Sequence, residues 1–321
     1  MRKELLFTDM NGRGRREAAG LWLCGGAWTV TENARGRFEM KKKGFTKYLF
    51  VLPGFCFFAF AMLLPFFMGI HIAFTDWDGV APEYHFVGLK NFIAIFKDTR
   101  IKAPFLNTLE FALLGTVIGN IIPLSLALLV NGKYAKLNTI ARVIFFIPVC
   151  LSSVLTAFLW KFLYHEFFPE VFGWKNILGN PRWVILGIVI IGVWNTAGTN
   201  MLIYLSGLKN IPLELYEAAK MDGATGIQRF RMITLPLLMP SFSVCVTLTL
   251  TSWLKEFATT LSATSGGPGG SSRTVSIYVF DNLYKYYKAG YGQAISLLFA
   301  FILIVVGLLV SSFFRRREVE L

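Results

Sequence analysis

The side chains that could perform chemistry in this sequence are few and widely scattered. The three histidines, His71, His85 and His165, form no HExxH pair, and the sequence contains no Gly-x-Ser-x-Gly elbow. A Walker motif is also missing, because no Lys-Ser or Lys-Thr pair follows the glycine-rich run 265–271 at the required spacing. The four cysteines are far apart and include no CxxC pair. The sequence therefore predicts no catalytic residue, no metal site and no cofactor.

Polar residues inside strongly apolar segments are better candidates for function. A charged side chain near the centre of a membrane costs roughly 2.5–3.5 kcal/mol, so such a residue is a functional candidate by default. Two segments combine aromatic with polar side chains, one around residue 196 and one around residue 253. In the second segment, helical spacing places the polar residues and the tryptophan on one face. The candidates are Trp194, Thr196, Thr199, Thr249, Ser252, Trp253 and Glu256, although Lys255 and Glu256 could also simply face water near the membrane surface.

The composition is that of a protein that crosses a membrane several times. Of the 321 residues, 55% are hydrophobic and 16% are charged, which is too apolar for an ordinary soluble protein. The net charge of +13 does not require nucleic acid as a partner, because basic residues gather at the cytoplasmic ends of membrane spans. We predict an all-α fold with six transmembrane helices, each near the ~20 residues that cross a bilayer, at about 46–74, 107–131, 140–164, 183–206, 235–262 and 292–314.

Basic residues also predict the orientation of these spans in the plasma membrane. A lysine cluster precedes the first span and three arginines follow the last one, so both termini should lie in the cytoplasm. The loop 207–234 is then cytoplasmic as well. Residues 1–39 contain only a short apolar run, and we expect either a disordered tail or an upstream mis-called start, because a start at Met40 is typical of a membrane protein. The rest, 40–321, should form one transmembrane domain.

The loop between the fourth and fifth predicted spans is polar and contains two helix-ending signals. Pro212 suits a first helical position, where its missing N–H would be unpaired anyway. Gly223 can take the left-handed conformation that ends a helix. Thr225 with Gln228 is typical of a capping box that opens a second helix. The loop is therefore predicted to be two short helices joined by a turn.

This loop resembles the EAA loop of ABC importer permeases. Glu217, Ala218 and Ala219 are followed, without a gap, by Gly223 and by the Ile-x-Leu-Pro sequence at 233–236. The residues at 207–216 are similar to the carbohydrate branch of that family. Two further segments have counterparts there, the Val-Gly-Leu-Lys-Asn-Phe sequence at 87–92 and the glycine-rich run at 265–271. The resemblance covers about residues 45–314.

The resemblance implies a permease with the type I ABC importer fold that hydrolyses no ATP itself. It implies two copies of a separate ABC ATPase, a second permease subunit that is a different chain, an extracytoplasmic solute-binding protein and a sugar substrate, all assembled in membrane lipid without nucleic acid. The EAA loop would be a coupling helix that docks on the ATPase. Its contacts would come from Glu217, Ala218, Ala219, Asp222 and Gly223.

Sugars combine hydroxyl groups with an apolar ring face, so a sugar site needs both hydrogen-bonding and aromatic side chains. Counted from the EAA and glycine-rich loops, six of the candidates fall on sugar-contacting positions of maltose-type permeases, namely Thr196, Thr199, Thr249, Ser252, Trp253 and Glu256. The residue types differ, so the sugar need not be maltose. One alternative is a permease for a glycerophosphodiester or phosphorylated polyol, which would favour more cations than Lys255 along the path. Another is a stand-alone secondary carrier, which would need no coupling loop.

Overall fold

The computed structural model describes residues 48–132 and 135–316. The expected tail or mis-called start at 1–39 lies outside them. The chain divides into two compact units, Met1–Phe67 and Met68–Leu321. What is described of the first unit is helical and includes a π-helical turn, η1 (Ala59–Leu63); the helix then continues through α2 (Leu64–Ala73).

The second unit contains the remaining helices. Its described residues contain no β-strand, and the one antiparallel bridge joins Thr75 to Phe86. The α-helices are α3 (Lys90–Lys97), α4 (Lys102–Val130), α5 (Ala135–Phe146), α6 (Ser153–Phe162), α7 (Phe168–Phe172), α8 (Val184–Lys209), α9 (Leu213–Met221), α10 (Gly226–Arg229), α11 (Leu235–Leu237), α12 (Met239–Leu254), α13 (Ala258–Thr264), α14 (Val275–Phe280) and α15 (Ala289–Arg315). The 3₁₀ and π segments are η2 (Thr99–Ile101), η3 (Ile147–Cys150), η4 (Leu163–Phe167), η5 (Ile177–Gly179), η6 (Phe230–Thr234) and η7 (Asp281–Lys285).

The all-α membrane fold predicted from the sequence is confirmed. Four helical stretches are long and apolar enough to cross a membrane, Tyr48–Ala73, Thr99–Val130, Val184–Lys209 and Ala289–Arg315. The third and fifth predicted spans are each bent pairs of helices, so the described residues hold six spans if each pair counts as one.

The third span, predicted as one helix over 140–164, is broken near its middle. Asn138–Cys150 and Ser153–Phe172 meet at an angle of 99°. Pro148 has no N–H to continue a helical ladder, and Leu151 is extended. Ser152 then caps α6, its hydroxyl accepting a hydrogen bond from the Leu155 N–H at 3.2 Å.

The fifth span, predicted over 235–262, is also more broken than expected. The helix bends by 68° at Leu238, α12 ends at Leu254, and a separate short helix, α13, begins at Ala258. Glu256 lies in the gap between them. The expectation that Glu256 shares one helical face with Thr249 is therefore wrong, because the helix has already ended.

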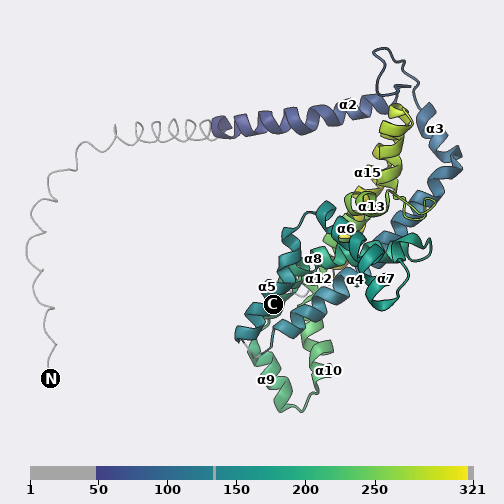
Figure 1. Cartoon of the computed structure of the whole chain (residues 1–321). Coiled ribbons are helices and arrows are strands. Elements are labelled where there is room, and N and C mark those ends of the chain that lie inside the picture. The colour runs from purple at the N-terminus through teal and green to yellow at the C-terminus, as the bar shows by residue number, and fades with distance from the viewer. Residues whose placement is uncertain (1–47, 133–134, 317–321) are drawn as a thin grey trace, which may run out of the picture. The chain divides into compact units, whose positions relative to one another are not determined.

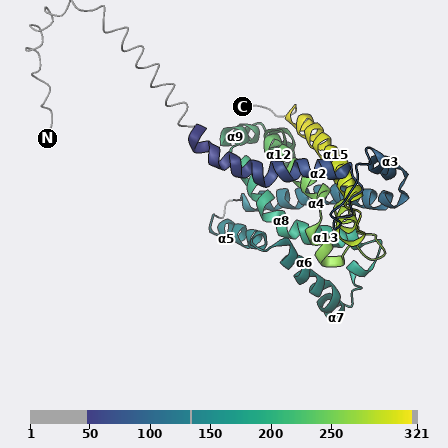
Figure 2. The same ribbon diagram turned by 90° about the horizontal axis from the view of Figure 1, so that it is seen from above.

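Three helices, α4, α8 and α12, form the centre of the second unit (Figures 1 and 2). Towards the start of α4 they bury a cluster around Phe111, Ile188 and Trp253. Towards its end they bury a second cluster around Met201 and Tyr204. At the first of these ends, α3 and α14 pack on α15 through a third cluster.

The helical hairpin α9–α10 projects from the other end, beyond Val130 (Figure 1). Its turn is a Schellman motif: the Gly223 N–H donates to the Lys220 carbonyl at 3.1 Å, and the Ala224 N–H donates to the Ala219 carbonyl at 2.9 Å. Gly223 has φ of +76°, as predicted. The capping box at the start of α10 is also confirmed. Pro212 is the N-cap rather than the first helical residue.

Candidate functional site

A cavity of about 400 Å³ opens between the broken third span, α8 and the end of α12. It brings together six of the seven predicted site residues, whose positions in the chain span both apolar segments. Most of its lining residues carry a hydroxyl or an amide, beside one carboxylate and one indole. They are Ser153, Gly192, Asn195, Thr196, Thr199, Asn200, Leu248, Thr249, Ser252, Trp253, Glu256 and Thr259.

Four hydroxyl residues of this lining are exposed, Ser153 on α6 and three on α8 and α12. Thr196, Thr199 and Ser252 all expose their side chains. The Thr196 hydroxyl donates to the Gly192 carbonyl one turn earlier at 2.9 Å, which leaves its lone pairs to accept. Because α8 and α12 face each other here, the cavity presents hydroxyls from two opposite walls.

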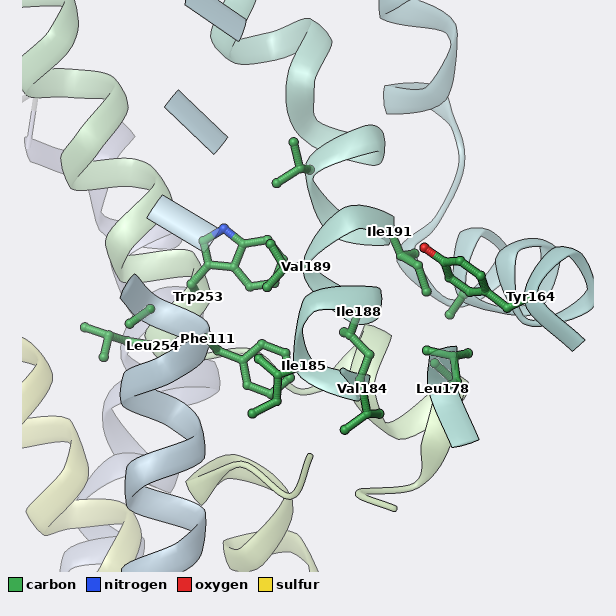
Figure 3. Packing of buried hydrophobic residues seen from close by; sticks show 14 residues of the cluster. Phe111, Tyr164, Leu178, Val184, Ile185, Ile188, Val189, Ile191, Trp253 and Leu254 are labelled. Atoms are coloured by element: carbon green, nitrogen blue, oxygen red, sulfur yellow. The ribbon is translucent and has the colours of Figure 1, made fainter. Parts of the chain in front are cut away.

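Trp253 forms the apolar side of the cavity and is held rigidly. Its indole is stacked on Phe111, with ring centroids 6.2 Å apart and an interplanar angle of 5°, as Figure 3 shows. Only 6% of the residue is exposed. The ring fits there because Gly115 on α4 and Gly192 on α8 have no side chains; a Cβ on either glycine would overlap it. Trp253 thus belongs to the core and reaches the cavity with a small part of its surface.

Glu256 reaches the cavity from the gap between α12 and α13. Its Oε1 accepts hydrogen bonds from the backbone N–H groups of Thr259, at 2.9 Å, and Thr260, at 3.1 Å. The Glu256 carbonyl also accepts a hydrogen bond from the Thr274 hydroxyl at 2.9 Å. This carboxylate is therefore fixed in place at the start of α13 while its residue remains part of the cavity wall.

Thr249 lines the cavity but uses its hydroxyl inside the protein. Tyr204 donates to the Asn120 Oδ1 at 2.6 Å, the Asn120 Nδ2 donates to the Thr249 Oγ1 at 2.8 Å, and Thr249 donates to the Cys245 carbonyl at 2.7 Å. This chain ties α4, α8 and α12 together. Asn120 and Tyr204 were missed by the sequence analysis, although an asparagine in the second apolar span could have been found by the same reasoning that found Glu256.

Asn195 supports the broken third span. Its Nδ2 lies 2.8 Å from the Pro148 carbonyl, 3.2 Å from the Leu151 carbonyl and 3.1 Å from the Thr156 hydroxyl. The break at Pro148 frees carbonyls that have no water to bind inside a membrane, and this amide is their partner. Asn195 therefore contributes structure to the cavity wall.

Trp194 is the predicted residue that the structure does not bring into this cavity. It faces an adjoining apolar cavity of about 620 Å³ between α4, α8 and the third span. There it meets Trp160 edge-to-face, with ring centroids 5.7 Å apart.

The residues predicted to contact an ATPase lie together at the α9–α10 hairpin. Glu217, Ala218, Asp222 and Gly223 are exposed, and Ala219 is half-buried. Two large apolar side chains beside them are also exposed, Met221 by 88% and Ile227 by 80%. The hairpin is braced from below by a 2.9 Å hydrogen bond between the hydroxyls of Tyr216 and Thr234.

Comparison with known proteins gives a consistent result. The family model described as binding-protein-dependent transport system inner membrane component matches residues 119–318. The chain is 31% identical to the probable starch degradation products transport system permease protein AmyD of Thermoanaerobacterium thermosulfurigenes, over 87% of this chain and 97% of that protein. It is 33% identical to the trehalose/maltose transport system permease protein MalF of Thermococcus litoralis, over 80% of this chain and 89% of that protein.

A solved structure shares the fold. A chain of a bacterial ABC transporter involved in the import of the acidic polysaccharide alginate superposes with a TM-score of 0.75 at 23% identity, over 87% of this chain and 98% of that chain.

Proposed function

The chain belongs to the family of binding-protein-dependent transport system inner membrane components, and on that premise we propose that it is the permease subunit of an ATP-driven importer for a sugar or oligosaccharide. It forms half of the translocation path, and a second permease, a different chain, forms the other half. Two copies of an ABC ATPase and an extracytoplasmic solute-binding protein complete the transporter. Both termini lie in the cytoplasm.

The observation that carries the sugar proposal is the chemistry of the cavity between α8 and α12. It offers accessible hydroxyls at Thr196, Thr199 and Ser252, an indole edge at Trp253 and a fixed carboxylate at Glu256. Neutral sugars suit such mixed surfaces, because their hydroxyls pair with polar groups while their C–H groups contact the apolar indole edge. Relatives of this chain are named for starch degradation products and for trehalose and maltose.

A phosphorylated solute is not favoured by this lining. Among the described residues that line the cavity there is no lysine or arginine, and its one ionisable side chain is the acidic Glu256. A phosphate would lack a cation to pair with in this lining. A stand-alone carrier is not favoured either, because it would not need an exposed hairpin like α9–α10.

The hairpin supports the proposed coupling to the ATPase. Its exposed Met221 and Ile227 are the kind of apolar side chains that a protein partner buries. Glu217, Ala218, Ala219, Asp222 and Gly223 would lie against the same partner. Because nothing lies within 4 Å of a Cβ built at Gly223, a larger side chain there would meet the partner before it met this chain.

The coupling is tested with Gly223→Asp in the assembled transporter in vesicles. We expect solute uptake to be lost while the protein remains in the membrane, with Gly173→Asp as the control. Gly173 has a similar φ of +67° and equally open surroundings, but it lies after α7, away from the hairpin. Normal uptake by Gly223→Asp, or equal loss in both variants, would contradict the docking role.

The sugar site is tested with Thr199→Val, which removes a hydroxyl from the cavity lining. Thr251→Val is the matched control, because Thr251 lies on α12 but is not part of that lining. An uncharged hydrogen bond contributes about 0.5–1.5 kcal/mol, so the solute concentration for half-maximal uptake should rise roughly two- to tenfold for Thr199→Val alone. If neither Thr199→Val nor Ser252→Ala changes the solute concentration for half-maximal uptake, the solute binds elsewhere.

A further inference from the structure

A third cavity, of about 440 Å³, lies at the end of the second unit opposite the α9–α10 hairpin, and nothing in the proposed transport path uses it. It is lined by three basic side chains, two tyrosines and the glycine-rich loop, through Arg100, Ala103, Pro104, Gly269, Gly270, Arg273, Tyr278, Asn282, Tyr286 and Lys288. This end of the molecule faces away from the cytoplasm if the proposed orientation holds.

The walls of this cavity are held in place by hydrogen bonds between distant segments. The Asn107 Nδ2 donates to the carbonyls of Gly270 and Arg273, both at 3.0 Å, and fixes the glycine-rich loop to α4. The Thr108 hydroxyl accepts from the Val275 N–H at 2.9 Å and fixes the start of α14 to the same helix. The basic groups are therefore presented by a preorganised frame.

The acids of this region are already used by other groups. The Asp98 Oδ2 accepts hydrogen bonds from the hydroxyls of Tyr278, at 2.8 Å, and Tyr291, at 2.9 Å, while its Oδ1 accepts from the Arg100 Nε at 3.0 Å. Burial alone would raise the pKa of Asp98, but these hydrogen bonds outweigh it and hold that pKa well below its usual range. Asp281 lies 3.5 Å from the Arg273 Nε.

Basic residues outnumber these acids around the cavity. The residues that line the cavity include three cations, Arg100, Arg273 and Lys288, and no acid. No described residue forms an ion pair with Lys288, and the Arg100 side chain is 74% exposed despite its bond to Asp98. A cavity wall with three cations and no acid is complementary to an acidic partner.

The residue types around this cavity favour a protein partner. Beside the cations, Tyr284, Tyr286 and Tyr287 are exposed, and tyrosine and arginine are the residues that protein interfaces favour. We infer that this basic cavity receives an acidic side chain of the solute-binding protein, with Arg100, Arg273 and Lys288 as its partners. The inference rests on the proposed function, because it requires a transporter that a binding protein activates.

The test uses the assembled transporter in nanodiscs of phosphatidylcholine and measures ATPase activity against the concentration of its solute-loaded binding protein. Lys288→Glu should raise the concentration for half-maximal stimulation about tenfold or more, equal to about 1.4 kcal/mol, with basal and maximal rates unchanged. Lys175→Glu is the matched control, an exposed lysine between the third and fourth spans, which the proposed orientation places outside the cytoplasm as well. It should shift the value less than twofold. Added salt should weaken the wild type more than Lys288→Glu.

The outcomes separate the inference from the proposed function. If the binding protein does not stimulate the wild type, the proposed function fails. If it does, but Lys288→Glu and Lys175→Glu behave alike, the cavity is not the docking site. If the difference appears only when phosphatidylglycerol is added to the nanodiscs, the cavity binds a lipid headgroup and the inference is wrong. Arg100→Gln, which keeps Asp98 bonded to two tyrosines, should give a smaller shift in the same direction as Lys288→Glu; an unchanged value would also overturn the inference.

Discussion

The close packing of the Trp253 indole against Gly115 and Gly192 allows one prediction to be worked out quantitatively. On α4, Gly115 faces the indole so closely that a Cβ would overlap the ring, whereas one turn later a Cβ at Gly119 would lie 3.7 Å from its nearest neighbours. The ring cannot easily move aside, because Phe111 stacks on it and Gly192 packs on its far edge. Gly115→Ala should therefore overpack the core, which typically costs 1–3 kcal/mol.

Gly119→Ala is the control that isolates this cost. Both changes replace glycine by alanine inside the same helix and gain a similar helix propensity, about 1 kcal/mol, so that contribution cancels in their difference. At about 2–4 °C for each kcal/mol, Gly115→Ala should unfold roughly 2–12 °C below Gly119→Ala in detergent.

A second substitution tests the cause. Trp253→Phe has a smaller ring, so combining it with Gly115→Ala should cost less than the sum of the two single changes. Equal unfolding midpoints for Gly115→Ala and Gly119→Ala would refute the proposed packing of the indole against Gly115. Strictly additive losses of stability for Gly115→Ala and Trp253→Phe would refute it as well.

Three further predictions follow from the buried polar groups. Tyr204→Phe removes the donor to the Asn120 Oδ1 and should destabilise the protein by about 1–3 kcal/mol, measured by thermal unfolding; a neutral result would mean that Asn120 finds another donor. Asn195→Leu leaves the carbonyls of Pro148 and Leu151 without their amide and should lower the unfolding midpoint more than Asn131→Leu, at the exposed end of α4. Because Asp98 has a lowered pKa in the folded state, its contribution to stability is present above the ordinary aspartate pKa of about 3.9 and is lost as pH falls below that value. Between pH 7 and pH 3 the unfolding midpoint of Asp98→Asn should therefore fall less steeply than that of the wild type.

The features predicted correctly from the sequence are those that local chemistry decides. Gly223 ends α9 and Thr225 opens α10 because both depend on neighbours within a few residues. The membrane fold follows from hydrophobic length in the same way. What the sequence could not supply is which surface each polar group faces. Asn195 lies between two candidates for the solute path, Trp194 and Thr196, yet its amide is taken up by a carbonyl 44 residues earlier in the chain.

Two residues of the cavity lining, Trp253 and Glu256, illustrate the same limit. Trp253 was expected to stack on a sugar, and its actual neighbours, Gly115 and Gly192, come from two other spans. Glu256 was placed in the site by a helical spacing that ends before it, yet it lines the cavity because its carboxylate binds the start of the next helix. Trp253 thus depends on packing between distant spans, whereas Glu256 is placed by a local break in the helix that the polar spacing alone did not reveal.

The continuity of one stretch of chain connects the proposed coupling surface with the proposed solute site. From α10 the backbone continues through η6, α11 and the bend at Leu238 into α12, whose last turn carries Ser252 and Trp253. A displacement of the hairpin by an ATPase therefore acts on the same helix that forms one wall of the cavity. The bend lies next to Pro240, which lacks the N–H that would stiffen it, while Thr249 anchors the upper part of α12 to α4 through Asn120. If the ATPase moves the hairpin, the Asn120–Thr249 hydrogen bond lies between that movement and the cavity wall. Thr249→Val should accordingly alter the coupling between ATP hydrolysis and uptake more than Thr251→Val, whose hydroxyl donates to carbonyls of its own helix.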